Sequence, residues 1–157
     1  MFNLLGLLIA RKAEAHCDIP CGIYDPISAK IAAQSVQKMV LRIQALEPPG
    51  ANADTAARQS YANTISRYVT VKEEHAEIVK KELTILWADY GWPNLAADFD
   101  LHGNFNQALK LAGRCKQNVD MAACEELVAT VDRIATAFWA TKNVTYSDPN
   151  AAARYGS

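Results

Sequence analysis

The sequence is poor in the two residues that interrupt helices. Its 157 residues include only 7 glycines and 6 prolines, whereas half of all residues are hydrophobic and alanine is prominent among them. This composition favours a helical globular protein over a disordered chain. A chain of this length makes one domain and is long enough to bury a sizeable core.

Other absences exclude whole classes of protein. The formal net charge is -1 and no stretch is rich in lysine and arginine, which argues against a nucleic-acid-binding protein. Four cysteines are too few for a disulfide scaffold in a chain of this size. No apolar run approaches the ~18–20 residues that a membrane-spanning helix needs. We therefore expect no nucleic-acid partner and no membrane partner.

Apolar side chains recur every three or four residues in several long segments, which predicts helices. Asp25 and Pro26 are typical of a helix start, as the N-cap and the first helical residue. Residues 47–50 (EPPG) end this first helix. A polar linker over residues 51–54 leads to the second and longest helix, which residues 91–93 end.

Two further helices follow. The third is expected from about Phe99 to Cys115, and Asp120 caps the fourth. Short connections favour antiparallel neighbours, so we predict an all-α, up-down four-helix bundle over residues 25–142. Residues 143–157 are polar and rich in small side chains, and they are expected to form a flexible tail.

Residues 1–15 have the features of a processed leader. They contain an apolar stretch and end in the small-x-small pattern of a cleavage site, Ala13-Glu14-Ala15. However, Arg11 and Lys12 follow the apolar stretch, whereas a secretory signal carries its positive charge before it. We therefore predict a cytoplasmic protein whose leader is removed by a peptidase, and export by this leader is left open as a second possibility. The alternative is an amphipathic N-terminal helix that stays on the protein.

The segment that follows, residues 16–21 (HCDIPC), gathers two thiols and an imidazole. Cleavage after Ala15 would add a free α-amine on His16. A metal that bridges this amine and the backbone nitrogen of Cys17 closes a five-membered ring, and the Cys17 nitrogen and sulfur close a second one. Cys21 can supply the fourth corner of the plane, and the His16 ring can bind from above it.

Such a planar set of nitrogen and sulfur donors suits Ni(II) or Cu(II), whereas zinc prefers a tetrahedron. Three hypotheses follow from the residues. The segment is the centre of a redox metalloenzyme, or it sequesters nickel or copper without turnover, or Cys17 and Cys21 cycle between dithiol and disulfide. The spacing of the two cysteines, taken alone, favours a simple thiol pair.

Extended by Gly22-Ile23-Tyr24-Asp25-Pro26, this segment resembles the N-terminal nickel hook of the nickel superoxide dismutase family. The resemblance covers roughly residues 16–142, and it implies that residues 16–24 form the hook. Three more motifs occur in the order that the family has: Lys72-Glu73-Glu74-His75-Ala76-Glu77, Leu86-Trp87-Ala88-Asp89-Tyr90 and Phe138-Trp139-Ala140-Thr141-Lys142. The resemblance implies a leader that is removed to expose His16, a four-helix bundle, and six copies in a hollow hexamer.

The resemblance also implies an enzyme. It predicts that superoxide is converted to oxygen and hydrogen peroxide by Ni(II)/Ni(III) cycling, after cleavage between Ala15 and His16. Tyr24 is expected beside the nickel, where its hydroxyl positions small anions and water. Tyr90 matches a second tyrosine near the same pocket, although packing alone would explain both rings. The expected ligands of one nickel ion per chain are His16, Cys17 and Cys21.

Some positions depart from the family's pattern. Ala32 and His75 stand where well-known members have a glutamate and an arginine that hold the axial imidazole. Alanine cannot accept that hydrogen bond, and His75 is either a partial substitute or an ordinary core histidine. A lysine that follows the second tyrosine in some members is absent, since Gly91 follows Tyr90.

Several other side chains need no functional explanation. Cys115 and Cys124 flank a predicted turn between two helices and are expected to be buried structural thiols. Packing in the core is enough to explain Trp87, Phe138 and Trp139. No basic cluster that could attract superoxide is visible near the hook.

Overall fold

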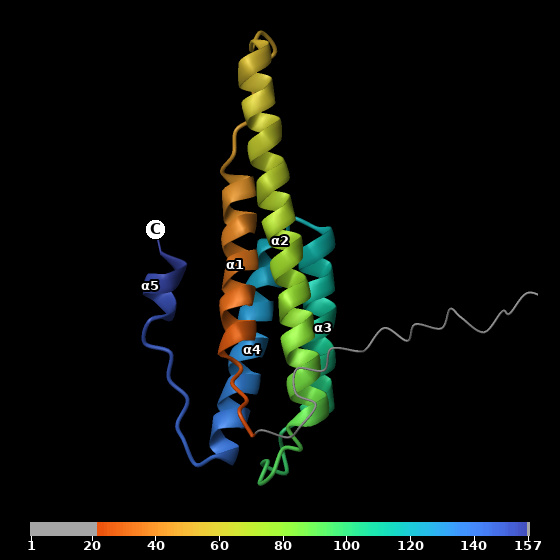
Figure 1. Cartoon of the computed structure of the whole chain (residues 1–157), viewed down its shortest axis with the longest axis vertical. Coiled ribbons are helices and arrows are strands. Elements are labelled where there is room, and N and C mark those ends of the chain that lie inside the picture. Colours follow the sequence, from red (N-terminus) through yellow and green to blue (C-terminus); the bar gives the residue numbers. More distant parts are fainter. Residues whose placement is uncertain (1–21, 157) are drawn as a thin grey trace, which may run out of the picture.

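A computed structural model of the chain describes residues 22–156 (Figure 1). Over this range the chain is helical and contains no strand, which confirms the all-α class. None of the helices described is long and apolar enough to cross a membrane. The helices are α1 (Ile27–Gln44), α2 (Thr55–Asp89), α3 (Leu101–Gln117), α4 (Met121–Thr141) and α5 (Ala151–Tyr155).

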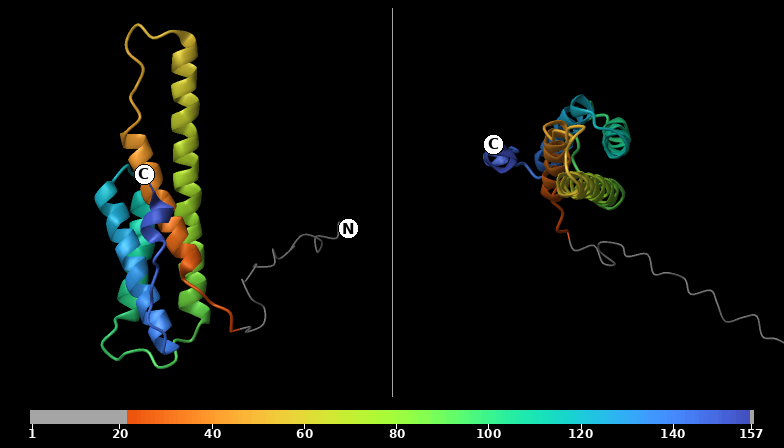
Figure 2. Two further views of the ribbon diagram at one scale, coloured as in Figure 1. Left: turned by 90° about the vertical axis from the view of Figure 1, so that its left-hand side faces the viewer. Right: turned by 90° about the horizontal axis from the view of Figure 1, so that it is seen from above.

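The first four helices form the predicted up-down bundle (Figures 1 and 2). α1 packs against α2 and α4, and α3 packs against the same two helices. α2 is the longest helix, and its first turns extend beyond the end of α1 (Figure 1). The connections from α1 to α2 and from α2 to α3 therefore lie at opposite ends of the bundle.

Aspartate side chains define where the helices begin. Three N-cap carboxylates each accept a hydrogen bond from the backbone nitrogen three residues later. They belong to Asp54, Asp100 and Asp120. Because Asp100 is the cap, α3 begins at Leu101 rather than near Phe99. α1 begins at Ile27, one residue later than predicted, where the Asp25 carboxylate accepts from the Ile27 nitrogen at 2.9 Å.

The core uses small side chains on α1 and larger ones on α4. The helical periodicity of apolar residues predicts Ile31 of α1 and Ile78 of α2 to be part of the buried face, which is wrong, because Ile31 is 42% exposed and Ile78 is 40% exposed. Alanines face the other helices instead and let the helix axes approach closely. The core residues of α1 are Ala29, Ala32, Ala33, Val36 and Val40, and those of α4 include Leu127, Ile134 and Phe138.

The segment expected to be a flexible tail contains α5, which lies beside α1 outside the bundle (Figure 2). Polar side chains of α1 make the contacts. The Gln34 amide donates to the Ala151 carbonyl at 3.1 Å, and Lys38 donates to the Gly156 carbonyl at 2.9 Å. Attachment through hydrogen bonds explains why a segment without an apolar stripe still packs. Its flexibility stays a prediction.

Two lysines are buried, which the helical periodicity did not predict. Lys30 and Lys72 are each only 3% exposed. Lys30 on α1 forms an ion pair with Asp132 on α4. The Lys72 ammonium instead donates to three backbone carbonyls at the C-terminal end of α3, at 2.7, 2.6 and 3.2 Å, which are those of Cys115, Lys116 and Asn118. Lys72 thus caps α3 from the neighbouring helix.

Candidate metal centre

The predicted metal ligands His16, Cys17 and Cys21 lie outside the residues that the structure describes. From residue 22 to residue 156, no group of three or more His, Cys, Asp or Glu side chains could hold a metal ion. The hook therefore carries the candidate ligand set of the chain. Two thiols and an imidazole are soft and borderline donors, which fit nickel or copper and not a cation that prefers oxygen ligands.

Tyr24 and Tyr90 meet at one end of the bundle. Tyr24 precedes α1 and Tyr90 follows the last residue of α2, and their rings pack edge to face with centroids 5.6 Å apart. The Tyr24 hydroxyl donates to the Asp89 carbonyl at 3.4 Å. Because Tyr24 is only three residues from Cys21, their Cα atoms cannot be more than about 11 Å apart. The short chain segment between Tyr24 and Cys21 therefore keeps the tyrosine pair near the hook.

The two tyrosine hydroxyls have different surroundings. The Tyr90 oxygen lies 2.6 Å from the Thr141 hydroxyl oxygen. Thr141 already donates its own hydrogen to the Phe138 carbonyl at 2.6 Å, so Tyr90 is the donor in this pair. The Tyr90 hydroxyl is therefore engaged by α4, whereas that of Tyr24 contacts the C-terminal end of α2.

A tight turn after α2 holds Tyr90 in place. Gly91 and Trp92 both have positive φ angles, 75° and 46°, so the chain reverses within two residues. The Trp92 indole then folds back and donates to the Leu86 carbonyl at 3.2 Å. Its ring packs edge to face on Tyr90, with centroids 5.2 Å apart. The Tyr90 ring is consequently packed between this turn and α4.

Lys142 brings a positive charge to the tyrosine pair. Its ammonium lies 5.3 Å from the centroid of the Tyr90 ring and 5.3 Å from that of Phe138, within the range of a cation–π contact. The sequence lacks a lysine after Tyr90, and the cation comes instead from the end of α4. Spacing along the chain gives no signal for this, because Tyr90 and Lys142 belong to different helices. The only sequence signal for Lys142 is its place in the motif over residues 138–142 that resembles the family.

Ala32 and His75 lie on neighbouring helices, α1 and α2. Ala32 is buried in the core, where it offers no side-chain acceptor. The Nδ1 atom of His75 donates to the Val71 carbonyl at 2.9 Å, one turn earlier in α2. Fifteen residues separate His75 from Tyr90, which is about 22 Å along a helix. These contacts fit a histidine whose ring is held by its own helix.

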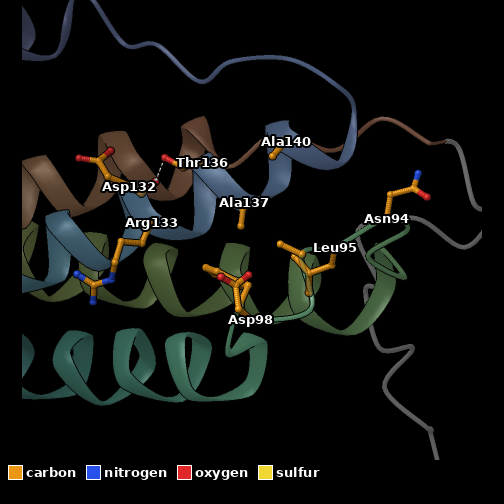
Figure 3. A pocket seen from close by; sticks show the side chains of 10 residues that line it. Asn94, Leu95, Asp98, Asp132, Arg133, Thr136, Ala137 and Ala140 are labelled. Carbon is orange, nitrogen blue, oxygen red and sulfur yellow. Dashed lines mark hydrogen bonds between the residues drawn. The ribbon is translucent and has the colours of Figure 1, made fainter.

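A cavity of about 610 Å³ lies between α4 and the connection from α2 to α3 (Figure 3). Its walls are mostly apolar, and in Figure 3 Leu95 and Asp98 come from the connection whereas Ala137 and Arg133 come from α4. No residue predicted to take part in catalysis lines it. The candidate centre is therefore the end of the bundle near Tyr24, and not this cavity.

The fold and the candidate ligands together fit the class of all-α metalloproteins, in which a four-helix bundle follows a short N-terminal segment that carries the candidate ligands. A sequence model of the nickel-containing superoxide dismutase family matches residues 11–142, a range that includes the whole hook. The chain belongs to the nickel-containing superoxide dismutase family.

Individual relatives agree with this assignment. The chain is 34% identical over 142 residues to a superoxide dismutase [Ni] of Streptomyces seoulensis, and the match covers 88% of this chain and 98% of the relative. It is 31% identical to a superoxide dismutase [Ni] of Streptomyces coelicolor, with the same coverage of both chains.

Solved structures of nickel superoxide dismutase are similar in fold as well. A native structure aligns with a TM-score of 0.64 at 31% identity, over 82% of this chain and 100% of the other. A structure described as having the nickel ligation of the oxidised state aligns with the same TM-score at 32% identity and the same coverage.

Proposed function

We propose that this chain is the precursor of a nickel-dependent superoxide dismutase, and that cleavage between Ala15 and His16 makes it active. The observation that carries the proposal is that the family match runs through residues 16–21. The part of the chain described by the structure offers no competing set of three metal ligands. The reaction consumes two superoxide anions and two protons and yields oxygen and hydrogen peroxide.

The proposed ligands contribute different donor atoms. Cleavage gives His16 a free α-amine, and the two cysteines supply thiolates. Pro20 restricts its own φ angle and the conformation of Ile19, which limits the ways in which Cys21 can return towards Cys17. His16, Cys17 and Cys21 would hold the nickel, and the metal would supply the one-electron redox chemistry that superoxide disproportionation needs.

The tyrosine pair and Lys142 supply the surroundings of that reaction. By exchanging its 3.4 Å hydrogen bond to the Asp89 carbonyl for one to a small anion or water, the Tyr24 hydroxyl can position that molecule beside the hook. The Lys142 ammonium adds positive charge at the same end of the bundle, which attracts an anionic substrate. Tyr90 supports Tyr24 through the contact between their rings.

Tyr24→Phe and Tyr90→Phe are expected to differ in effect. Loss of the Tyr24 hydroxyl removes a hydrogen bond to the substrate or its water and lowers kcat/KM about tenfold. Loss of the Tyr90 hydroxyl removes its hydrogen bond to Thr141 and costs about 1 kcal/mol of stability, with a smaller effect on rate. Superoxide decay and thermal unfolding of both variants measure the two quantities. Full activity of Tyr24→Phe would contradict the role assigned to this hydroxyl.

Lys142→Gln is expected to slow the enzyme through electrostatics. Removing the charge should lower kcat/KM about threefold at low salt and reduce its dependence on ionic strength. The control is Lys110→Gln, which removes an exposed lysine from α3. Decay rates at several salt concentrations test the difference. Equal salt dependence in the two variants would mean that Lys142 does not attract the substrate.

The two rival functions are separated by one set of measurements on the cleaved protein. The proposal expects one nickel per chain and accelerated superoxide decay that requires the metal. A protein that only sequesters nickel or copper would bind metal without accelerating decay. A dithiol module would cycle between thiol and disulfide and would show no dependence on nickel.

We further propose that the mature protein is a cytoplasmic homohexamer. The resemblance to the family supports six copies, and the order of charges in residues 1–15 supports a leader that does not export the chain. The first turns of α2 extend beyond the other helices (Figure 1), and they carry partly exposed apolar side chains that a second copy could cover: Tyr61, Ile65 and Tyr68. Sedimentation analysis of the cleaved protein tests the assembly, and a stable monomer would contradict it.

A further inference from the structure

Cys115 and Cys124 form a buried pair of thiols that the dismutase reaction does not use. Cys115 belongs to the last turn of α3 and Cys124 to the first turns of α4, on either side of a short connection. Both residues are 0% exposed. The Cys124 thiol donates a hydrogen bond to the Cys115 sulfur, and the two sulfur atoms are 3.4 Å apart. Two free thiols are therefore already in contact, inside a protein whose product is an oxidant.

The surroundings make the two thiols unequal. The hydrogen bond from Cys124 lowers the pKa of the Cys115 thiol, and the charges of Lys72 and Arg114 act in the same direction, against burial and Asp120. The same hydrogen bond and burial raise the pKa of the Cys124 thiol. Cys115 is thus the sulfur that more readily becomes a thiolate, and Cys124 keeps its proton. A thiolate next to a protonated thiol is the arrangement that a two-step oxidation needs.

Lys72 fixes this arrangement from a third helix. Its ammonium donates to the Cys115 carbonyl at 2.7 Å and to the next carbonyl at 2.6 Å, which anchors the turn that carries the sulfur. Arg114 and Asp120 form an ion pair across the same connection. The end of α3 and the start of α4 are consequently held together in the register that places the two sulfurs in contact.

We propose that Cys115 and Cys124 are a peroxide-sensitive site, at which hydrogen peroxide oxidises the two thiols to an intramolecular disulfide. The Cys115 sulfur attacks one peroxide oxygen, the O–O bond breaks, and one water leaves with the formation of a sulfenic acid. The Cys124 sulfur then attacks the Cys115 sulfur, the S–O bond breaks, and the second water leaves. In sum, two thiols lose two protons and two electrons, and one peroxide takes up both and becomes two waters.

The contact between the sulfurs determines the product. A sulfenic acid with a resolving thiol beside it condenses to a disulfide rather than being oxidised further. The sulfurs need to move from 3.4 Å to the ~2.05 Å of a disulfide bond, a small adjustment within one helix connection. The idea that the enzyme itself supplies the peroxide rests on the proposed function. The contact between the two thiols is independent of that function.

The test treats the cleaved, nickel-loaded protein with hydrogen peroxide. The protein is then digested with trypsin in the absence of reductant, and the peptides are analysed by mass spectrometry. Trypsin cuts after Arg114, Lys116 and Arg133, so the disulfide would join the dipeptide 115–116 to the peptide 117–133. The hook cysteines fall in a separate peptide, 16–30. We expect the joined peptides, lighter by two hydrogens, and their separation by reductant. Oxidation confined to peptide 16–30 would overturn the proposal.

Matched variants test the order of the two steps. In Cys124→Ser the resolving thiol is missing, so a sulfenic acid should accumulate on Cys115 and react with a dimedone probe. In Cys115→Ser the Cys124 thiol should stay reduced. Equal labelling of the single remaining thiol in both variants would overturn the assignment of Cys115 as the attacking sulfur. Because the hydrogen peroxide is added, the thiol oxidation test does not depend on dismutase activity. A failed dismutase assay would therefore count against the proposed function and not against the thiol site.

Discussion

The full-length chain is expected to show no nickel-dependent superoxide decay, whereas the same chain starting at His16 is expected to be active. Before cleavage, position 16 has only a peptide nitrogen, which is a poor ligand, in place of a free α-amine. Removing an outer partner of a metal ligand already costs about 10–100-fold, so losing a ligand should cost more than about 100-fold. Decay rates and nickel content of the two chains, prepared side by side, measure the effect.

Two substitutions make this experiment specific to the hook. Cys17→Ser in the cleaved chain removes a thiolate and should abolish activity as completely as the uncut leader does. Cys115→Ser removes a thiol of the same type from the core and should leave the decay rate unchanged. If the uncut chain were as active as the cut one, or if Cys17→Ser kept its activity, the hook would not be the catalytic centre.

Lys72→Met is expected to lower the free energy of unfolding by about 3 kcal/mol. The substitution keeps the aliphatic volume but removes the only donor that the structure gives three carbonyls at the end of α3. Hydrogen bonds from a charged donor contribute about 1.5–3 kcal/mol each, and relief of the buried charge offsets part of this loss. Denaturant unfolding of the wild type and the variant measures the difference.

The control for this prediction is Lys81→Met, which changes an exposed lysine on the same helix and should alter stability by less than about 0.5 kcal/mol. A loss of less than about 1 kcal/mol in Lys72→Met would mean that the three carbonyls find other partners.

The Lys72 contribution should also depend on pH. Burial lowers the pKa of Lys72 below its ordinary value of 10.5. In the window between that lowered pKa and 10.5, the unfolded chain binds more protons than the folded one. Stability from this group therefore rises with pH through that window. The difference in unfolding free energy between wild type and Lys72→Met should widen as the pH is raised towards 10.5.

The helices could be predicted from the sequence because their physical causes are local, and the candidate ligands of the hook, which lie outside the described residues, are proposed on equally local grounds. Ring closure around a metal depends on how many atoms separate the donors of His16 and Cys17, and those atoms are contiguous in the chain. The helix starts at Asp54 and Asp120 depend on a side chain reaching a backbone nitrogen three residues later. The periodicity of apolar residues then suffices to predict a bundle, and the short connections predict its antiparallel order.

Only the tertiary structure showed how Tyr24, Tyr90 and Lys142 lie relative to one another. Tyr24, Tyr90 and Lys142 belong to three segments that meet where α1 begins and where α2 and α4 end, and no spacing along the chain encodes that contact. The same holds for Lys72 beneath the end of α3 and for the contact between Cys115 and Cys124. The buried face of α1 also differed from the most hydrophobic face, because close packing of the helices favours alanine over isoleucine at the contact. Local covalent geometry is thus enough to propose the metal ligands and to predict the helices, whereas the contacts between distant segments follow only from packing in the tertiary structure.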